Sequence, residues 1–354
     1  EDSIAYNLSV GADVGLTSNQ RDRYGYSGQF GVSAANERAD GLLSISYDNA
    51  GAQFNADGDR ILPNGIANNE RLGFLAKAGF NLTDEQRLGL TYSFFRQLRD
   101  TEFTFDNAVA ADPDAEFGRA LRINADYEES PEQINHVLNL TYRNEDILGS
   151  QLDAQLYYRD TQEVGIFTDL RGLGLPPFFP ILWQTALEDT EIGGRLQLDT
   201  PLGNSASLLW GADYSGNETA SPLLINDTAA LDANDEVNVI DRSLDRFPAY
   251  DVDSLGLFAQ GTWDISDQFQ VSGGIRYEDV GLSVDDYRLA FAFSPIRERE
   301  GGNNSFDEVL FNAGLLYRPT EEIGLFANFA QGFSIPNVGS ALALVDPGFD
   351  VTAD

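Results

Sequence analysis

Apolar and polar residues alternate one by one along almost the whole chain. The first segment places small or polar residues between Ile4, Tyr6, Leu8, Val10, Ala12, Val14 and Leu16. Successive side chains of a β-strand point to opposite faces, so this period of two predicts a strand with one apolar face. The same pattern returns near residues 23–34, 71–80, 205–214 and 268–277. The sequence therefore predicts an all-β protein.

The residues on the two faces favour a membrane barrel over a soluble sandwich, although alternation alone fits both. Many apolar rows begin or end with an aromatic ring, namely Tyr6, Tyr24, Tyr92, Tyr142, Trp210, Trp263, Tyr277 and Tyr317. Such rings are typical of the girdles at the two lipid interfaces of a barrel. The opposite rows carry Arg, Asp, Gln, Ser and Gly. We therefore expect an antiparallel transmembrane β-barrel with a water-filled interior.

Short and long connections alternate between the predicted strands. The short ones are residues 36–40, 82–86, 144–149, 202–204, 265–267 and 319–322, and the long ones are about 50–69, 99–132, 164–189, 217–251 and 282–306. Outer-membrane barrels have short periplasmic turns and long extracellular loops. This rhythm predicts about 13 strands in one domain over residues 1–354, with a last strand that rises into a loop. An odd count predicts a barrel that does not close within these residues.

Composition excludes several other classes of protein. The formal net charge of −35 disfavours a nucleic-acid partner. The lack of cysteine excludes disulfides and thiolate metal sites. No stretch approaches the ~20 apolar residues that a transmembrane helix needs. The chain also lacks methionine and a basic, apolar leader, so we expect a fragment of a mature protein.

Several strings carry a resemblance to a known family. They are FNADGDRI at 54–61, LLWGADY at 208–214, GLFAQ at 256–260, WDIS at 263–266, SGGIRYE at 272–278, LYRPT at 316–320 and LFANFAQGFSIP at 325–336. Together they make the chain similar to TonB-dependent siderophore receptors. The resemblance is to the ferric aerobactin type, common in cyanobacteria, which recognises citrate-hydroxamate siderophores. It spans nearly the whole chain.

The resemblance implies an outer-membrane receptor that binds a ferric siderophore and imports it with TonB-coupled energy. In the family, about 22 strands close around a plug domain. Roughly nine strands, the plug and its TonB-coupling segment are therefore expected to be absent from this chain. Iron would arrive already chelated, as substrate, so no cofactor and no protein metal site are expected. The resemblance further implies a monomer surrounded by outer-membrane lipid and lipopolysaccharide.

Aromatic and guanidinium groups on the loops are the candidate ligand contacts. Rings pack on the organic shell of a chelate, and arginine pairs with citrate or hydroxamate oxygens. The first candidates share one loop: Phe167, Arg171, Phe178, Phe179 and Trp183. Weaker candidates are Tyr214, Arg242, Arg246, Tyr250 and Tyr287. The alternative is that these side chains only pack the loops together or join the girdle.

Two other functions remain open at the level of sequence. A passive porin or sugar channel would use a similar sheet. An outer-membrane lipid hydrolase would use His136, the only histidine, which falls on an apolar row without a recognisable serine partner. We therefore expect no enzyme activity.

Pairs of acidic residues recur in the long connections. They are Asp57 with Asp59, Asp112 with Asp114, Glu128 with Glu129, and Asp285 with Asp286. Carboxylates bind divalent cations, but the spacing matches no calcium loop closely. Solvated acidic loops are the simpler interpretation.

Overall fold

Thirteen long strands build one continuous wall. The computed structural model describes residues 3–15, 23–56, 58–60, 69–99, 103–105, 120–122, 127–169, 182–227, 229–230, 233, 239–289, 297–332, 334 and 337–344. The wall strands are β1 (Ser3–Val14), β2 (Tyr24–Ala35), β3 (Ala39–Ala50), β4 (Asn69–Asn81), β5 (Gln86–Arg99), β8 (Glu132–Ile147), β9 (Ser150–Val164), β11 (Leu182–Pro201), β12 (Ala206–Asn226), β13 (Ile240–Ser266), β14 (Phe269–Val284), β17 (Gly302–Thr320) and β18 (Ile323–Ala330).

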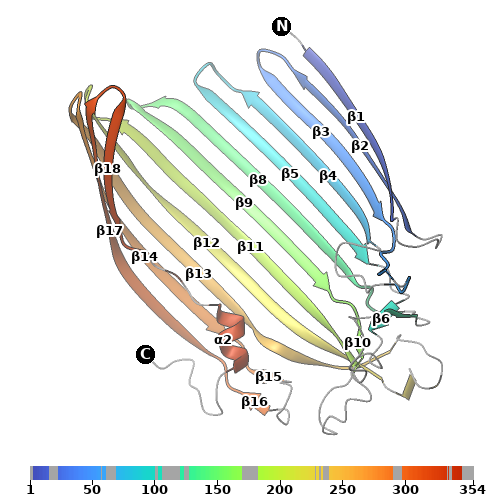
Figure 1. Cartoon of the computed structure of the whole chain (residues 1–354). Coiled ribbons are helices and arrows are strands. Elements are labelled where there is room, and N and C mark those ends of the chain that lie inside the picture. The colour runs from blue at the N-terminus through green and yellow to red at the C-terminus, as the bar shows by residue number, and fades with distance from the viewer. Residues whose placement is uncertain are drawn as a thin grey trace.

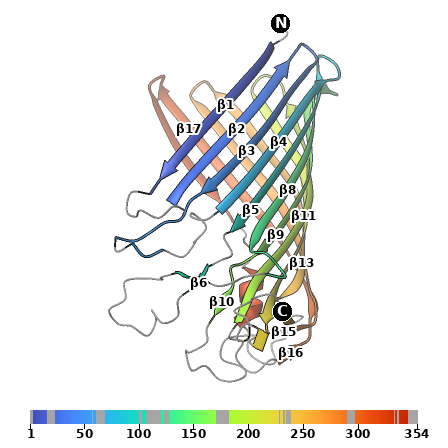
Figure 2. The same ribbon diagram turned by 90° about the vertical axis from the view of Figure 1, so that its right-hand side faces the viewer.

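Each wall strand pairs antiparallel with the next one along the chain, so the order of the wall follows the sequence (Figure 1). The short strands β10 (Thr168–Asp169), β15 (Tyr287–Leu289) and β16 (Arg297–Arg299) extend this sheet, and β6 (Phe103–Phe105) pairs with β7 (Ala120–Arg122) apart from it. The wall curves into an open trough with β1 and β18 at its two ends (Figure 2). The predicted all-β class, strand number and antiparallel order are confirmed.

Tight turns join the strands at one end of the wall, and the longer connections lie at the other (Figure 1). Leu148 and Gly149 make the turn between β8 and β9, and both have positive φ, of 56° and 80°. Two such residues give a turn whose twist matches that of the flanking strands. The predicted long connection 217–251 is shorter than expected, because β12 continues to Asn226 and β13 begins at Ile240.

The two faces of the wall differ in chemistry, as the alternation predicts. Leu8 is 75% exposed and Val10 79% exposed, although both are apolar. No second sheet covers this face, because the only other sheet in the described residues consists of β6 and β7. The apolar rows are therefore outward-facing and free to meet lipid. A dry interior between two stacked sheets, the main alternative, is excluded.

Aromatic rings lie on the outward face near both ends of the strands. At the short-turn end Phe269 stacks on Tyr317, with ring centroids 4.3 Å apart. At the long-connection end Tyr26 lies beside Tyr47, at 5.9 Å. These positions suit aromatic belts at the two interfaces of a bilayer.

Two ion pairs on the polar face each cross an intervening strand. Arg276 on β14 reaches Asp213 on β12, with 2.7 Å between Nη2 and Oδ1, over Gly256 on β13. Arg87 on β5 reaches Asp40 on β3 over Gly79 on β4. A Cβ on either glycine would collide with the guanidinium above it. We call each arrangement a three-strand ion pair.

The packed core is small and lies at the long-connection end. The helix α2 (Val338–Leu344) lies on the concave side of the wall (Figures 1 and 2). Its Val338 and Leu342 pack against Val284 and Tyr287, with Tyr250 at the edge. A second cluster joins Leu223, Ile225 and Leu244 to Trp183. No helix in the described residues has both the length and the apolar content to cross a bilayer.

Candidate ligand-binding site

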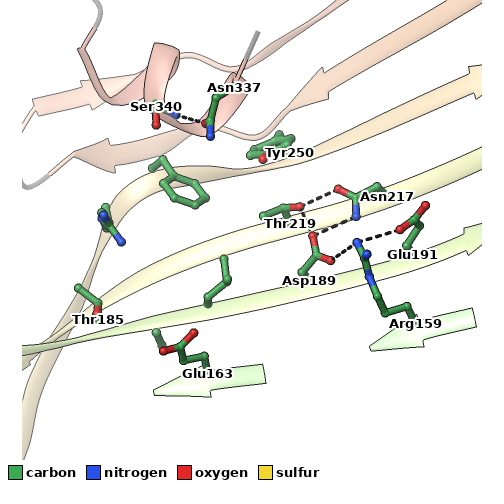
Figure 3. A pocket seen from close by; sticks show the side chains of 14 residues that line it. Arg159, Glu163, Thr185, Asp189, Glu191, Asn217, Thr219, Tyr250, Asn337 and Ser340 are labelled. Carbon is green, nitrogen blue, oxygen red and sulfur yellow. Dashed lines mark hydrogen bonds and ion pairs between the residues drawn. The ribbon is translucent and has the colours of Figure 1, made fainter. Parts of the chain in front are cut away.

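A cavity of about 600 Å³ lies on the concave face at the long-connection end, next to α2 (Figure 3). It is lined by Arg159, Glu163, Thr185, Ala186, Leu187, Asp189, Glu191, Asn217, Thr219, Arg246, Phe247, Tyr250, Asn337 and Ser340. Polar-face residues of β9, β11 and β12 share this cavity with residues of α2 and its approach. The polar face is therefore the concave one, which lines the interior of the barrel.

A fixed ionic network forms one wall of the cavity. The Arg159 guanidinium lies between Asp189, at 3.1 Å, and Glu191, at 2.8 Å (Figure 3). The Asp189 carboxylate also accepts hydrogen bonds from Asn217, at 3.0 Å, and Thr219, at 2.8 Å. These groups converge because the register pairs Arg159 with Glu191 and Asp189 with Thr219 on neighbouring strands. The carboxylates neutralise Arg159 and hold it in one position.

The opposite wall is aromatic and carries a second arginine. The rings of Phe247 and Tyr250 lie 6.1 Å apart on β13. Gly339 of α2 approaches the Phe247 ring so closely that a Cβ would meet it at 3.0 Å. In the described part of the chain, Arg246 has no hydrogen-bond or ion-pair partner, although it lines the cavity. Its guanidinium is the cavity's available anion-binding group.

The structure brings Arg246 and Tyr250 together at this cavity and places three other predicted contacts in packed positions. Phe167 is 1% exposed. Tyr287 is 4% exposed and belongs to the cluster beneath α2. Trp183 is partly buried and packs against the cluster around Leu244. These three rings therefore lie in packed positions, as the alternative interpretation expects. Three more predicted contacts, Arg171, Phe178 and Phe179, lie outside the described residues.

Tyr214 is on the wrong face to meet a ligand inside the barrel, which corrects its place among the candidates. Its neighbour Asp213 points inward to Arg276, so Tyr214 points outward by alternation. The Tyr214 hydroxyl donates to Asp253, at 2.5 Å. Arg242 is engaged by the adjacent Asp241, at 3.0 Å.

The ionic network is not predicted from the loop residues, because its members lie within strands. Arg159, Asp189, Glu191, Asn217 and Thr219 are spread over β9, β11 and β12. Charged residues that share one face, at positions 159 and 163 and at positions 189, 191 and 195, were a visible signal. Pairing register, which local sequence does not specify, decides that these side chains meet.

His136 lies on the outward face in an aromatic setting. Its Nδ1 is 2.9 Å from the Tyr92 hydroxyl, and its ring centroid is 5.1 Å from that of Phe94. Across the sheet it is paired with Phe94 and Asp160. Neither of these partners is a serine.

Two of the loop carboxylates that the structure describes have local structural roles. Glu128 accepts a hydrogen bond from the backbone N–H of Ile240, at 3.0 Å, and Asp286 accepts one from Gly301, at 2.7 Å. No group of three or more His, Cys, Asp or Glu in the described residues has the geometry to hold a metal ion. Asp57, Asp112 and Asp114 lie outside those residues.

An apolar outer face, a polar inner face and the separation of tight turns from long connections define the wall of an outer-membrane β-barrel. The family model described as TonB dependent receptor-like, beta-barrel, matches residues 73–350. The chain therefore belongs to the TonB-dependent receptor family, whose barrels lie in the bacterial outer membrane. This is a family of receptors and transporters rather than of enzymes.

Curated relatives are siderophore receptors. The chain is 26% identical to the ferric aerobactin receptor of Klebsiella pneumoniae over 334 residues, which are 87% of the chain and 44% of the relative. It is 25% identical to the rhizobactin receptor of Rhizobium meliloti over 324 residues, 86% of the chain and 43% of the relative. The chain thus spans less than half the length of these relatives.

Solved structures share the fold at low identity. The FrpB iron transporter of Neisseria meningitidis superposes with a TM-score of 0.62 at 16% identity, over 96% of the chain and 47% of the transporter. The siderophore receptor PiuA of Acinetobacter baumannii gives 0.60 at 13% identity, over 93% of the chain and 49% of the receptor. A porin and a lipid hydrolase, the alternatives from sequence, are not favoured by these comparisons.

Proposed function

We propose that the protein containing this wall binds a ferric siderophore and imports it across the outer membrane with energy supplied through TonB. The observation that carries the proposal is the cavity beside α2, where Arg246 and the Tyr250 ring line the same space at the long-connection end of the inner face. The similarity of the chain to receptors named for aerobactin and rhizobactin supports the same ligand class.

The two walls of the cavity suit the two chemical parts of a citrate-hydroxamate chelate. Arg246 pairs with a carboxylate or hydroxamate oxygen, because a guanidinium offers parallel N–H donors to such groups. Phe247 and Tyr250 pack on the carbon skeleton of the ligand. The Arg159 network supplies fixed polar groups that do not rearrange on binding, which lowers the entropic cost of capture.

Iron is the cargo in this proposal, delivered within the chelate, and no cofactor or catalytic residue takes part. The protein works as a transporter rather than an enzyme or a passive pore. The outward apolar rows contact lipid, and the long-connection end meets the lipopolysaccharide leaflet. TonB engages a segment outside this wall, and the receptor is a monomer without a nucleic-acid partner.

Ligand binding by the full-length receptor tests the proposal. Purified receptor is titrated with ferric aerobactin, a ferric trihydroxamate, a ferric catecholate and haem, while its expression is compared in iron-replete and iron-starved cells. We expect tight binding of the citrate-hydroxamate chelate and induction by iron starvation. Binding of none of the four, together with no response to iron, would overturn the proposal.

A further inference from the structure

A second hollow lies on the same inner face, nearer the short-turn end. Its volume is about 540 Å³, and it is lined by Arg87, Thr141, Tyr142, Arg143, Asp153, Ala154, Gln155, Arg195 and Gln197. It shares β9 and β11 with the cavity beside α2. Along β9, Arg159 in the cavity and Gln155 in the hollow are separated by four residues, about 13 Å of strand. The hollow is therefore the next site along the wall on the way from the cavity beside α2 to the short-turn end.

The charge of this hollow is opposite to that of the chain. Arg87, Arg143 and Arg195 line it together with a single carboxylate, Asp153, in a protein with a net charge of −35. The three arginine side chains are 44%, 48% and 54% exposed. On the inner face of the wall they form a local anion-attracting patch.

The contacts of these arginines leave N–H donors for a ligand. A guanidinium has five donors. In the part of the chain that the structure describes, Arg195 donates only through Nη2, to Asp213 at 3.3 Å. Arg143 donates to Gln151 at 2.8 Å, while its contacts with Glu145 and Asp153 are 4.0 and 3.9 Å. These two separations are longer than a hydrogen bond, so an acceptor oxygen has room to bind Arg143.

Arg87 anchors the edge of the hollow. Its three-strand ion pair with Asp40 and its hydrogen bond to Asn81, at 2.9 Å, hold the side chain against the wall. Arg143 faces Arg87 directly across β5 and β8. Two guanidiniums paired in this way repel each other, and an anion placed near both relieves that repulsion.

We propose that Arg143 and Arg195, with Arg87 at their edge, form an inner anion site that binds a carboxylate of the ferric siderophore as it moves inward from the cavity beside α2. We call it the arginine subsite. A planar carboxylate matches the parallel donors of a guanidinium, and a citrate-type chelate carries such groups. The inference rests on the proposed function and adds a second position for the same ligand.

The subsite is tested in the full-length receptor by adding one negative charge to the hollow without breaking any ion pair. The variant is Gln197→Glu, whose new carboxylate competes with the ligand for Arg195 and Arg143. The matched control is Gln29→Glu on the inner face of β2, whose amide donates to Ser44 outside the hollow. Cells carrying each receptor are given ferric aerobactin labelled with radioactive iron. Surface binding without TonB and uptake with TonB are measured separately.

We expect Gln197→Glu to lower the uptake rate about tenfold, as the loss of one charge-assisted hydrogen bond would, with surface binding unchanged. Gln29→Glu should match the wild type in both measurements. A second variant, Arg143→Gln with Arg195→Gln, should give the same separation of uptake from binding, with receptor levels confirmed by heat-modifiable gel mobility.

Two results overturn the subsite while leaving the proposed function intact. One is normal uptake by Gln197→Glu in cells whose wild-type receptor binds and imports the chelate. The other is an equal loss of uptake in Gln29→Glu, which would mean that any inner-face charge has the same effect. Wild-type cells that neither bind nor import any of the four iron compounds, and whose receptor level does not respond to iron, contradict the proposed function itself.

Discussion

Arg276 on β14 and Asp213 on β12 form an ion pair across the strand between them, and Gly256 on that strand leaves the guanidinium room to lie over it. Asp213 also accepts from Arg195 on β11, at 3.3 Å, so one carboxylate links β11, β12 and β14. Backbone ladders tie only adjacent strands. This contact adds a cross-link between strands that share no backbone hydrogen bond.

Replacing the central glycine should break that cross-link. In Gly256→Val the new side chain occupies the position of the Arg276 guanidinium, so we expect unfolding to require about 1–3 kcal/mol less free energy. The measurement is urea unfolding of the full-length receptor in lipid vesicles. Gly281→Val is the matched control, because a Cβ at Gly281 on β14 has no atom within 4 Å. Equal stability of the two variants would contradict the account.

The assignment of the two faces predicts opposite tolerance at adjacent positions of β8. Leu140 faces outward and is 37% exposed, while Asn139 faces the interior and accepts a hydrogen bond from Gln155. Leu140→Arg should destabilise the receptor in vesicles by about 2–4 kcal/mol, the cost of a charge facing the lipid near the bilayer midplane. Asn139→Arg should cost far less. The assignment fails if the interior substitution is the costlier one.

Arg246 should account for a substantial part of ligand affinity. Arg246→Ala removes the cation that faces the cavity, and we expect the Kd for ferric aerobactin to rise about tenfold. Titration calorimetry or intrinsic fluorescence on the purified receptor measures it. Arg242→Ala, on the same strand, removes an equal charge from a pair with Asp241 outside the cavity lining. An equal change in Kd for both variants would assign the effect to general charge rather than to the site.

Attachment of α2 should matter for binding but little for the barrel wall. Leu342 is 4% exposed under the helix, so Leu342→Asp buries a charge without a partner and should release α2 from β13 and β14. We expect affinity for the chelate to fall several-fold while the unfolding midpoint of the wall stays near that of the wild type. Ala341→Asp places the same charge on the exposed side of the helix as a control.

The strands could be predicted from sequence because their signal is local. Alternation identifies a strand and assigns its faces, and the spacing of turns gives the order of an antiparallel wall. The lengths of β12 and β13 were harder to predict. Both strands continue through residues 217–226 and 240–251, where apolar and polar residues no longer alternate one by one although the ladder continues.

The candidate site was only partly predictable, for a different physical reason. In the sequence, an aromatic residue that packs against the protein cannot be told from one that binds a ligand. Residue type therefore did not separate Phe167 and Tyr287 from Tyr250. Tyr214 could have been excluded, because it alternates in step with Trp210 on the apolar row. The Arg159 network depends on which strands pair and in what register, which single-sequence patterns do not encode.

The three-strand ion pairs also affect the calibre of the barrel. Arginine has one of the longest side chains, and one that projected straight inward would narrow the passage for a bulky cargo. Because Arg87 and Arg276 lie flat over glycine, the wall keeps cationic groups at its surface and the passage through the barrel loses little of its width. A valine in place of Gly79 or Gly256 would therefore push a guanidinium into the path of the chelate as well as weaken the wall.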